Sequence, residues 1–341
     1  MRALSLLAAL VILGGCATAG PVPEGGGRPP ATAGGRLATG VIGESDEFVV
    51  VVPSREETAE TLAKAHLGDA SKAWMIEDFS GGRRVFKPGE RVVAPKRPWN
   101  LSGVEPNGYQ LVPILVYHNL GPQSKGRLVL GADAFAEQMR YLEREGYRVV
   151  TLAEFVEWTH LKRQLPKKSV VLTFDDGYHA FRDYAYPVLK KMGFPATLFV
   201  YTDYVGAGRN ALSWDELKSL AAEGFDVQAH SKTHGDLRRA SGETDAQYVR
   251  RMQAELAEPP RLFQRQLGRG PQFLAYPYGR VDDDLLARVR EHGYVAAFTV
   301  RRQSNSSFVR ALQINRSQIY SEMTLEQFAQ NLNVFHQENL R

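Results

Sequence analysis

Two adjacent carboxylates follow a strongly apolar segment of the sequence. Asp175 and Asp176 come directly after residues 169–174, which read Ser-Val-Val-Leu-Thr-Phe, and Gly177 follows them. Successive side chains of an extended chain point to opposite sides, so one carboxylate can bind a metal while the other stays free as a base. An acidic turn at the end of a strand is the structural alternative, because Asp-Gly pairs are common in turns.

Two histidines offer the donors that would complete such a site. His230 and His234 are four residues apart, a spacing that places both imidazoles on one face of a helical turn. With Asp176 they supply two nitrogens and one oxygen, the ligand set of a catalytic zinc site that keeps one position for water. Alone, the pair is equally compatible with two surface histidines. The combination with Asp176 favours a metal site.

Strands and helices are expected to alternate around these residues. Strands are predicted at 112–117, 148–150, 169–174, 196–200, 225–229, 273–275 and 295–300. Helices are predicted between them at 132–145, 152–159, 180–191, 214–223, 244–266 and 282–292. This alternation predicts a parallel sheet, open or closed into a barrel. His118, Asp175 and His230 each follow a predicted strand, and the carboxyl ends of parallel strands are where active sites form.

Three short motifs occur in a fixed order in this part of the chain. They are Thr-Phe-Asp-Asp-Gly at 173–177, His-Ser-Lys-Thr-His at 230–234 and Tyr-Pro-Tyr-Gly at 276–279, with supporting segments at 113–118, 193–200 and 212–214. On these motifs, residues 110–317 resemble the polysaccharide deacetylases, the NodB-homology domain of carbohydrate esterase family 4. The resemblance implies a distorted (β/α) barrel of about seven strands, with the domain extending over residues 110–341.

The same resemblance implies a role for each polar residue of the first two motifs. Asp176, His230 and His234 would bind a divalent metal, with Zn²⁺ as the expected ion. Asp175 would remain uncoordinated and act as the catalytic base. The expected reaction is the hydrolysis of N-acetyl groups from an N-acetylglucosamine polymer.

Further roles follow from the subgroup that the motifs resemble most, which acts on poly-β-1,6-N-acetylglucosamine. In that subgroup an early histidine, matched here by His118, is the candidate general acid, and a core histidine that caps a strand is the alternative. The backbone N–H of Tyr278 would help to hold the oxyanion. The residues expected to contact substrate are Tyr276, Pro277 and Trp214.

The chain departs from the wider family in two places. Many members have an arginine three residues before the tyrosine matched by Tyr278, whereas this chain has Ala275. The group that tunes Asp175 must therefore come from elsewhere. Arg301 and Arg316 are available, although surface positions are expected for both. The late Leu-x-x-His motif that usually supplies the general acid is also missing from the sequence.

The first residues resemble a bacterial lipoprotein signal. Arg2 precedes an apolar run at 3–13 that is too short to span a bilayer, and Gly-Gly-Cys16 follows. Residues 1–16 are therefore expected to be a signal peptide, with Cys16 as the lipidated residue and the periplasmic face of the outer membrane as the destination. A plain secretory signal is the alternative. Cys16 is the only cysteine, so the monomer contains no disulfide.

Two further segments separate the signal from the barrel. Residues 17–45 are rich in Gly, Pro, Ala and Thr, which predicts a flexible tether. A strand at 48–52, helices at 58–66 and 70–78 and a strand at 91–94 follow. On this βααβ order, residues 46–96 resemble a LysM domain, a binder of N-acetylglucosamine polymers. The family's usual Gly-Asp-Thr is absent, so a LysM-shaped spacer is the alternative. Residues 97–109 are expected to be a linker.

Composition is consistent with a globular protein in the cell envelope. The 341 residues are 43% hydrophobic and carry a net charge of +4 with dispersed basic residues, so no nucleic-acid partner is expected. The predicted substrate is poly-N-acetylglucosamine or peptidoglycan. A catalytically silent glycan-binding lipoprotein is one alternative, which the intact carboxylate and histidine set disfavours. The same chemistry on an ester or a non-glycan amide is the other.

Replacing Cys16 by serine tests the predicted anchor. A lipid chain supplies the membrane affinity, so Cys16→Ser should leave the protein unprocessed or soluble. The measurement is the partition of the protein between membrane and soluble fractions. Equal membrane partition of the variant and the unaltered chain would show that Cys16 carries no anchor.

Overall fold

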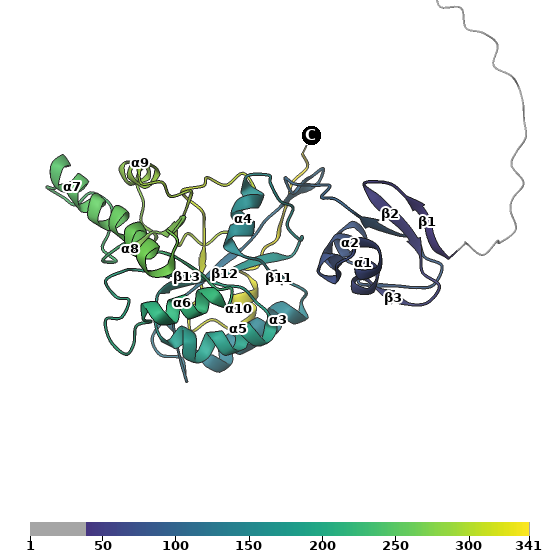
Figure 1. Ribbon diagram of the computed structural model, residues 1–341, viewed down its shortest axis with the longest axis horizontal. Helices are drawn as coiled ribbons and strands as arrows, with labels where there is room; N and C mark the ends of the chain where they lie inside the picture. Colours follow the sequence, from purple (N-terminus) through teal and green to yellow (C-terminus); the bar gives the residue numbers. More distant parts are fainter. Residues whose placement is uncertain (1–38, 341) are drawn as a thin grey trace, which may run out of the picture. The chain divides into compact units, whose positions relative to one another are not determined.

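The computed structural model describes residues 39–340 (Figure 1). The predicted signal peptide, Cys16 and most of the predicted tether lie outside the described residues. Within residues 39–340, none of the helices combines the length and the apolar character needed to cross a membrane.

A small antiparallel sheet with two helices begins the described chain. Strand β2 (Phe48–Val52) pairs with β1 (Gly40–Glu44) on one side and with β5 (Val92–Pro95) on the other. Between β2 and β5 lie β3 (Glu57–Thr58), α1 (Ala59–Leu67), α2 (Ala73–Phe79) and β4 (Val85–Phe86). The predicted strand–helix–helix–strand order is therefore confirmed. Its identity as a LysM domain stays a prediction.

The physical basis of this small unit is a compact apolar core and a capped helix. Val51, Leu62, Ile76 and Phe86 pack together, each almost completely buried. Thr58 begins α1 with a capping box, because its hydroxyl accepts a hydrogen bond from Thr61 N–H while Thr61 Oγ1 accepts one from Thr58 N–H. Strand β1 was assigned to the predicted tether of residues 17–45. It is a strand because it pairs along its length with the valine-rich β2.

A curled parallel sheet of seven strands forms the core of the remaining chain. Every neighbouring pair is parallel. The order across the sheet is β16 (Ala296–Phe298), β15 (Phe273–Ala275), β14 (Asp226–Ala229), β13 (Thr197–Val200), β12 (Ser169–Asp176), β8 (Ile114–Tyr117) and β17 (Ser317–Gln318). The short β11 (Arg148–Val149) pairs with the start of β12. The predicted distorted barrel is thus confirmed as a curled half-barrel.

Helices lie where the sequence predicts them, with two interruptions. The matching helices are α3 (Ala132–Arg144), α4 (Leu152–Thr159), α6 (Trp214–Ala222) and α9 (Asp283–Glu291). Helices α3, α5 (Tyr186–Met192) and α6 lie along one side of the sheet (Figure 1). The helix predicted at 180–191 begins as a π-helical turn and continues as α5 (Tyr186–Met192). The helix predicted at 244–266 is divided into α7 (Asp245–Met252), a π-helical turn (Gln253–Ala257) and α8 (Glu258–Leu267). Proline cannot donate the helical hydrogen bond, so Pro259 and Pro260 fit the start of α8.

Several short elements were not predicted. They are β17, α10 (Leu325–Ala329), the parallel pair β9 (Asn119–Gly121) and β10 (Val129–Gly131), and the antiparallel set β6 (Val104–Glu105), β7 (Gly108–Gln110) and β18 (Phe335–Gln337). Because β6 and most of β7 fall within residues 97–109, the segment expected to be a linker is in part a small sheet closed by the C-terminal strand.

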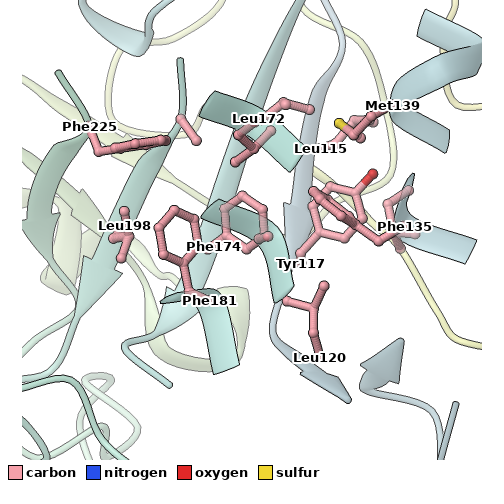
Figure 2. Close-up of a cluster of buried hydrophobic side chains, with 14 of the residues drawn as sticks. Leu115, Tyr117, Leu120, Phe135, Met139, Leu172, Phe174, Phe181, Leu198 and Phe225 are labelled. Atoms are coloured by element: carbon pink, nitrogen blue, oxygen red, sulfur yellow. The ribbon is translucent and has the colours of Figure 1, made fainter. Parts of the chain in front are cut away.

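Aromatic packing fixes the end of β12 from which the two aspartates project. Phe174 lies between Tyr117 of β8 and Phe181, with ring centroids at 5.2 and 4.8 Å, and Phe135 of α3 is 5.3 Å from Tyr117 (Figure 2). All four rings are buried. Alternation along the strand turns the next residue, Asp175, to the opposite face of the sheet from this cluster.

Candidate active site

Asp176, His230 and His234 converge beyond the carboxyl ends of β12 and β14. Asp176 Oδ1 lies 3.3 Å from His234 Nε2 and 3.6 Å from His230 Nε2. One potential ligand atom from each residue lies within 4.8 Å of the others. His230 Nδ1–H donates to the carbonyl oxygen of Ala275 at 2.7 Å, which leaves Nε2 free to coordinate.

The chemistry of these donors fits a divalent cation. Asp176 Oδ1 is buried without a hydrogen-bond partner, and a buried carboxylate oxygen of this kind is costly unless a cation binds it. Two imidazole nitrogens and one carboxylate oxygen are the ligand set of catalytic zinc sites.

The two histidines approach each other through a loop, and the predicted helical turn is wrong. Among residues 39–340, five non-glycine residues have a positive φ, and four of these lie at this site. They are Asp176 (77°), Ser231 (70°), His234 (63°) and Tyr278 (60°). Left-handed backbone is unfavourable for such residues and persists where the surroundings enforce it, often at functional sites.

A buried glutamate enforces the conformation of the histidine loop. Glu255 accepts hydrogen bonds from the N–H groups of Lys232 and Thr233, each at 3.0 Å, and from Thr233 Oγ1 at 2.6 Å. Ser231 Oγ accepts a further bond from His234 N–H at 3.0 Å. Glu255 lies in the π-helical turn before α8 and was not singled out in the sequence, where it reads as one more polar residue of a long helix.

The catalytic-base candidate Asp175 forms a buried ion pair with Arg316. The two guanidinium NH groups of Arg316 donate to the two carboxylate oxygens, both at 2.7 Å. Arg316 is fully buried, and it also donates to Thr173 Oγ1 at 3.2 Å and to the carbonyl oxygen of Thr299 at 3.0 Å. The expected surface position of Arg316 is therefore wrong, whereas Arg301 is exposed. Arg316 occupies the role left open by Ala275.

Opposite pKa shifts distinguish the two aspartates. Burial alone would raise the pKa of Asp175, but Arg316 and His230 outweigh burial and lower it to about 2. Burial dominates at Asp176 and raises its pKa to about 6. Burial also lowers the pKa of His230 to about 4 and lowers that of His234. The neutral imidazoles suit coordination, and a bound cation would keep Asp176 ionised.

The two aspartates do not point to opposite sides as expected. His230 Nε2 is 3.8 Å from Asp175 Oδ2, close to its 3.6 Å distance from Asp176 Oδ1. The reason is that the chain leaves the extended conformation at Asp176 and turns at Gly177. The different partners of the two carboxylates therefore separate their roles, with Arg316 on Asp175 and the histidines on Asp176.

The remaining predicted site residues fall into two groups. Half-buried His118 follows β8, and its Nδ1 is buried and unpartnered. Its proximity contributes to lowering the pKa of both aspartates. Tyr278 is 57% exposed, and its ring lies 4.9 Å from that of His234. Both are therefore at the site.

The three residues expected to contact substrate are buried or half-buried. Tyr276 is fully buried and its hydroxyl donates to the carbonyl oxygen of Leu312, so the ring cannot reach a ligand. Pro277 is also buried. Trp214 packs edge-on against Phe263 of α8 at 5.4 Å and extends the core between α6 and α8. Substrate contact by Pro277 and Trp214 stays a prediction.

Comparison with known families agrees with this geometry. Residues 162–297 match the polysaccharide deacetylase family, and the match includes both aspartates, both histidines and the Tyr-Pro-Tyr-Gly motif. Over these residues the chain is therefore similar to the polysaccharide deacetylases. His118 and Arg316 lie outside the matched residues, so their placement at the site rests on the structure.

Individual relatives match the deacetylase domain over part of their length. YxkH of Bacillus subtilis, named after the same family, is 30% identical over 188 residues, which are 55% of this chain and 64% of that protein. The poly-β-1,6-N-acetyl-D-glucosamine N-deacetylase of Staphylococcus epidermidis is 28% identical over 179 residues, which are 50% of this chain and 61% of that protein. The chain thus spans about three fifths of the length of these curated relatives.

Solved structures show the same fold. A deacetylase of Streptococcus pyogenes in complex with acetate is 28% identical with a TM-score of 0.59, and the match covers 65% of this chain and 98% of that one. IcaB of Ammonifex degensii is 26% identical with a TM-score of 0.58, and the match covers 66% of this chain and 97% of that one.

Replacing Arg316 by methionine tests the ion pair. Arg316→Met leaves Asp175 buried without its partner, so the free energy of unfolding should fall by roughly 3–5 kcal/mol. Adding Asp175→Asn should recover part of this loss, because a neutral amide costs less to bury than an unpaired charge. Urea unfolding measures both effects. The control is Arg310→Met, in a surface groove, and equal stability of Arg316→Met and this control would contradict the account.

Proposed function

We propose that the deacetylase domain hydrolyses N-acetyl groups of an N-acetylglucosamine polymer and releases acetate. The observation that carries the proposal is that the two adjacent carboxylates have different partners. Asp175 is ionised, buried and held by Arg316, while Asp176 faces two neutral imidazoles. The N-deacetylase named among the relatives supports the substrate class.

The metal in this proposal is held by Asp176, His230 and His234, and we propose Zn²⁺. When bound, such a cation would polarise the acetamide carbonyl and lower the pKa of a water molecule at the site to roughly 7.

The chain's own residues then perform the proton transfers. Asp175 accepts the proton of the attacking water, and its ion pair with Arg316 holds it ionised and correctly oriented for that step. The N–H of Tyr278 donates to the oxyanion that develops from the carbonyl, because the left-handed backbone there places the motif beside His234. His118 gives a proton to the leaving amine, since it follows β8 at the same edge of the sheet and its Nδ1 is buried without a partner.

Two polymers that contain N-acetylglucosamine are the candidate substrates. Similarity to the staphylococcal enzyme favours poly-β-1,6-N-acetylglucosamine, whereas the LysM-like unit favours peptidoglycan. We further propose that a lipid on Cys16 anchors the protein in the cell envelope, facing the periplasm. Retention of the complete ligand and base set disfavours a silent glycan-binding protein.

Two isosteric variants separate the proposed roles of the aspartates. Asp176→Asn removes a ligand, so both metal content and acetate release should fall. Asp175→Asn should keep the metal and lose ~10²–10⁴-fold in rate, the range expected for a positioned acid or base. Metal analysis of each purified variant, beside acetate release from acetylated polymers, makes the distinction. Asp226→Asn, at the opposite end of β14, is the matched control.

The opposite pattern would reverse the two roles. If Asp175→Asn loses the metal while Asp176→Asn keeps it, Asp175 is the ligand. His118→Ala should likewise keep its metal and lose rate. Full activity of that variant would assign the general acid to another residue.

A further inference from the structure

A series of aromatic rings leads away from the metal-ligand candidate His234. The ring of Tyr201 lies 5.1 Å from His234, Tyr204 stacks on Tyr201 at 5.1 Å with planes 16° apart, and Tyr178 meets Tyr204 edge-on at 5.7 Å. All three tyrosines are half-buried. None of them takes part in the proton transfers proposed above.

A surface groove begins where this series ends. Its volume is about 270 Å³. The lining residues are Asn119, Leu120, Tyr178, His179, Ala180, Asp183, Tyr204, Arg209 and Asn210. Sites for drug-sized ligands start at roughly 300 Å³, so this groove matches a smaller unit such as one sugar ring. Aromatic walls suit the apolar face of a sugar, and the amide, carboxylate and guanidinium groups suit its hydroxyls.

Tyr178 connects the groove to the reaction site. It follows Asp176 by two residues, and its ring lines the groove. Its edge-on contact with Tyr204 joins the groove wall to the series of rings that begins at His234.

The groove wall is held in place by a buttressed histidine. The ring of His179 is hydrogen-bonded through Nδ1 to Asp183 at 3.1 Å and through Nε2 to Glu216 at 3.0 Å. Its backbone N–H donates to the carbonyl oxygen of Asn210 at 2.8 Å. Glu216 also closes the capping box of α6 with Ser213. The motif at 212–214 thus supports the groove, which gives it a role other than direct contact with substrate.

We propose that this groove is a subsite for a neighbouring sugar unit of the polymer. The reacting unit lies at Asp176 and the histidines, and the adjoining unit packs against Tyr204. The enzyme therefore prefers units within an oligosaccharide to single N-acetylglucosamine. This inference rests on the proposed function, because it assigns the groove to the same substrate.

Chain-length dependence of the full-length protein tests the subsite. The substrates are β-1,6- and β-1,4-linked N-acetylglucosamine oligomers from the single unit to the pentamer, and the linkage that the unaltered enzyme accepts is used throughout. Its kcat/KM should rise from the single unit to longer oligomers. Tyr204→Ala should lower kcat/KM on the longer oligomers about tenfold, equivalent to 1.4 kcal/mol, and flatten this rise. Tyr204→Phe keeps the ring and should restore the chain-length preference.

The position of deacetylation gives a second, independent readout. If one neighbour must occupy the groove, mass spectrometry of the products should show one terminal unit that stays acetylated in the unaltered enzyme. Tyr204→Ala should weaken this positional preference. Asp183→Ala provides a second groove variant if Tyr204→Ala fails to fold, and Arg310→Ala, in a groove beside the amino end of β16, is the control with unaltered kinetics.

The outcomes distinguish the subsite from the proposed function. If the unaltered enzyme with normal metal content releases no acetate from any oligomer or polymer, the proposed function fails. If the enzyme is active but the groove variants keep the chain-length and positional preferences, the subsite alone is refuted. An equal loss on every substrate, the single unit included, also refutes it, because the tyrosine would then act at the reaction site.

Discussion

The buried ion pair between Arg316 and Asp175 is the interaction on which the site and the sheet both depend. Arg316 directly precedes β17 at one edge of the half-barrel, and its guanidinium donates to Thr299, which directly follows β16 at the other edge. It also bonds Thr173 and Asp175 of the central strand β12. One fully buried charge therefore connects both edges with the centre. Burying it is tolerated only because each of these bonds is formed, and the same bonds hold Asp175 ionised.

The arrangement of the candidate metal ligands depends on enforced backbone strain. Asp176, Ser231, His234 and Tyr278 all have left-handed backbone, at the last residue of β12 or in the segments that follow β14 and β15. Parallel strands deliver these loops to the same edge, but only the strained conformations bring the donor atoms together. Glu255 supports the histidine loop from outside the site.

The sequence predicts the fold, and its motifs contain the residues that converge at the candidate site, because both leave local signals. Alternating apolar segments indicate the parallel sheet, and the short motifs contain both aspartates and both histidines. It does not reveal Arg316, which lies 141 residues from its partner in a polar segment and whose burial only the closed sheet shows. Tyr276 follows a strand as an active-site residue would, yet packing buries it. The two-residue β17 is too short to give a periodic pattern.

A crystal structure of the zinc-loaded protein tests the central claim most directly, which is that adjacent aspartates are separated by their partners into a ligand and a base. The account predicts zinc on Asp176, His230 and His234, with Asp175 outside the coordination sphere and still paired through both oxygens with Arg316. Zinc coordinated by Asp175, or an Arg316 side chain turned away from it, would contradict the account.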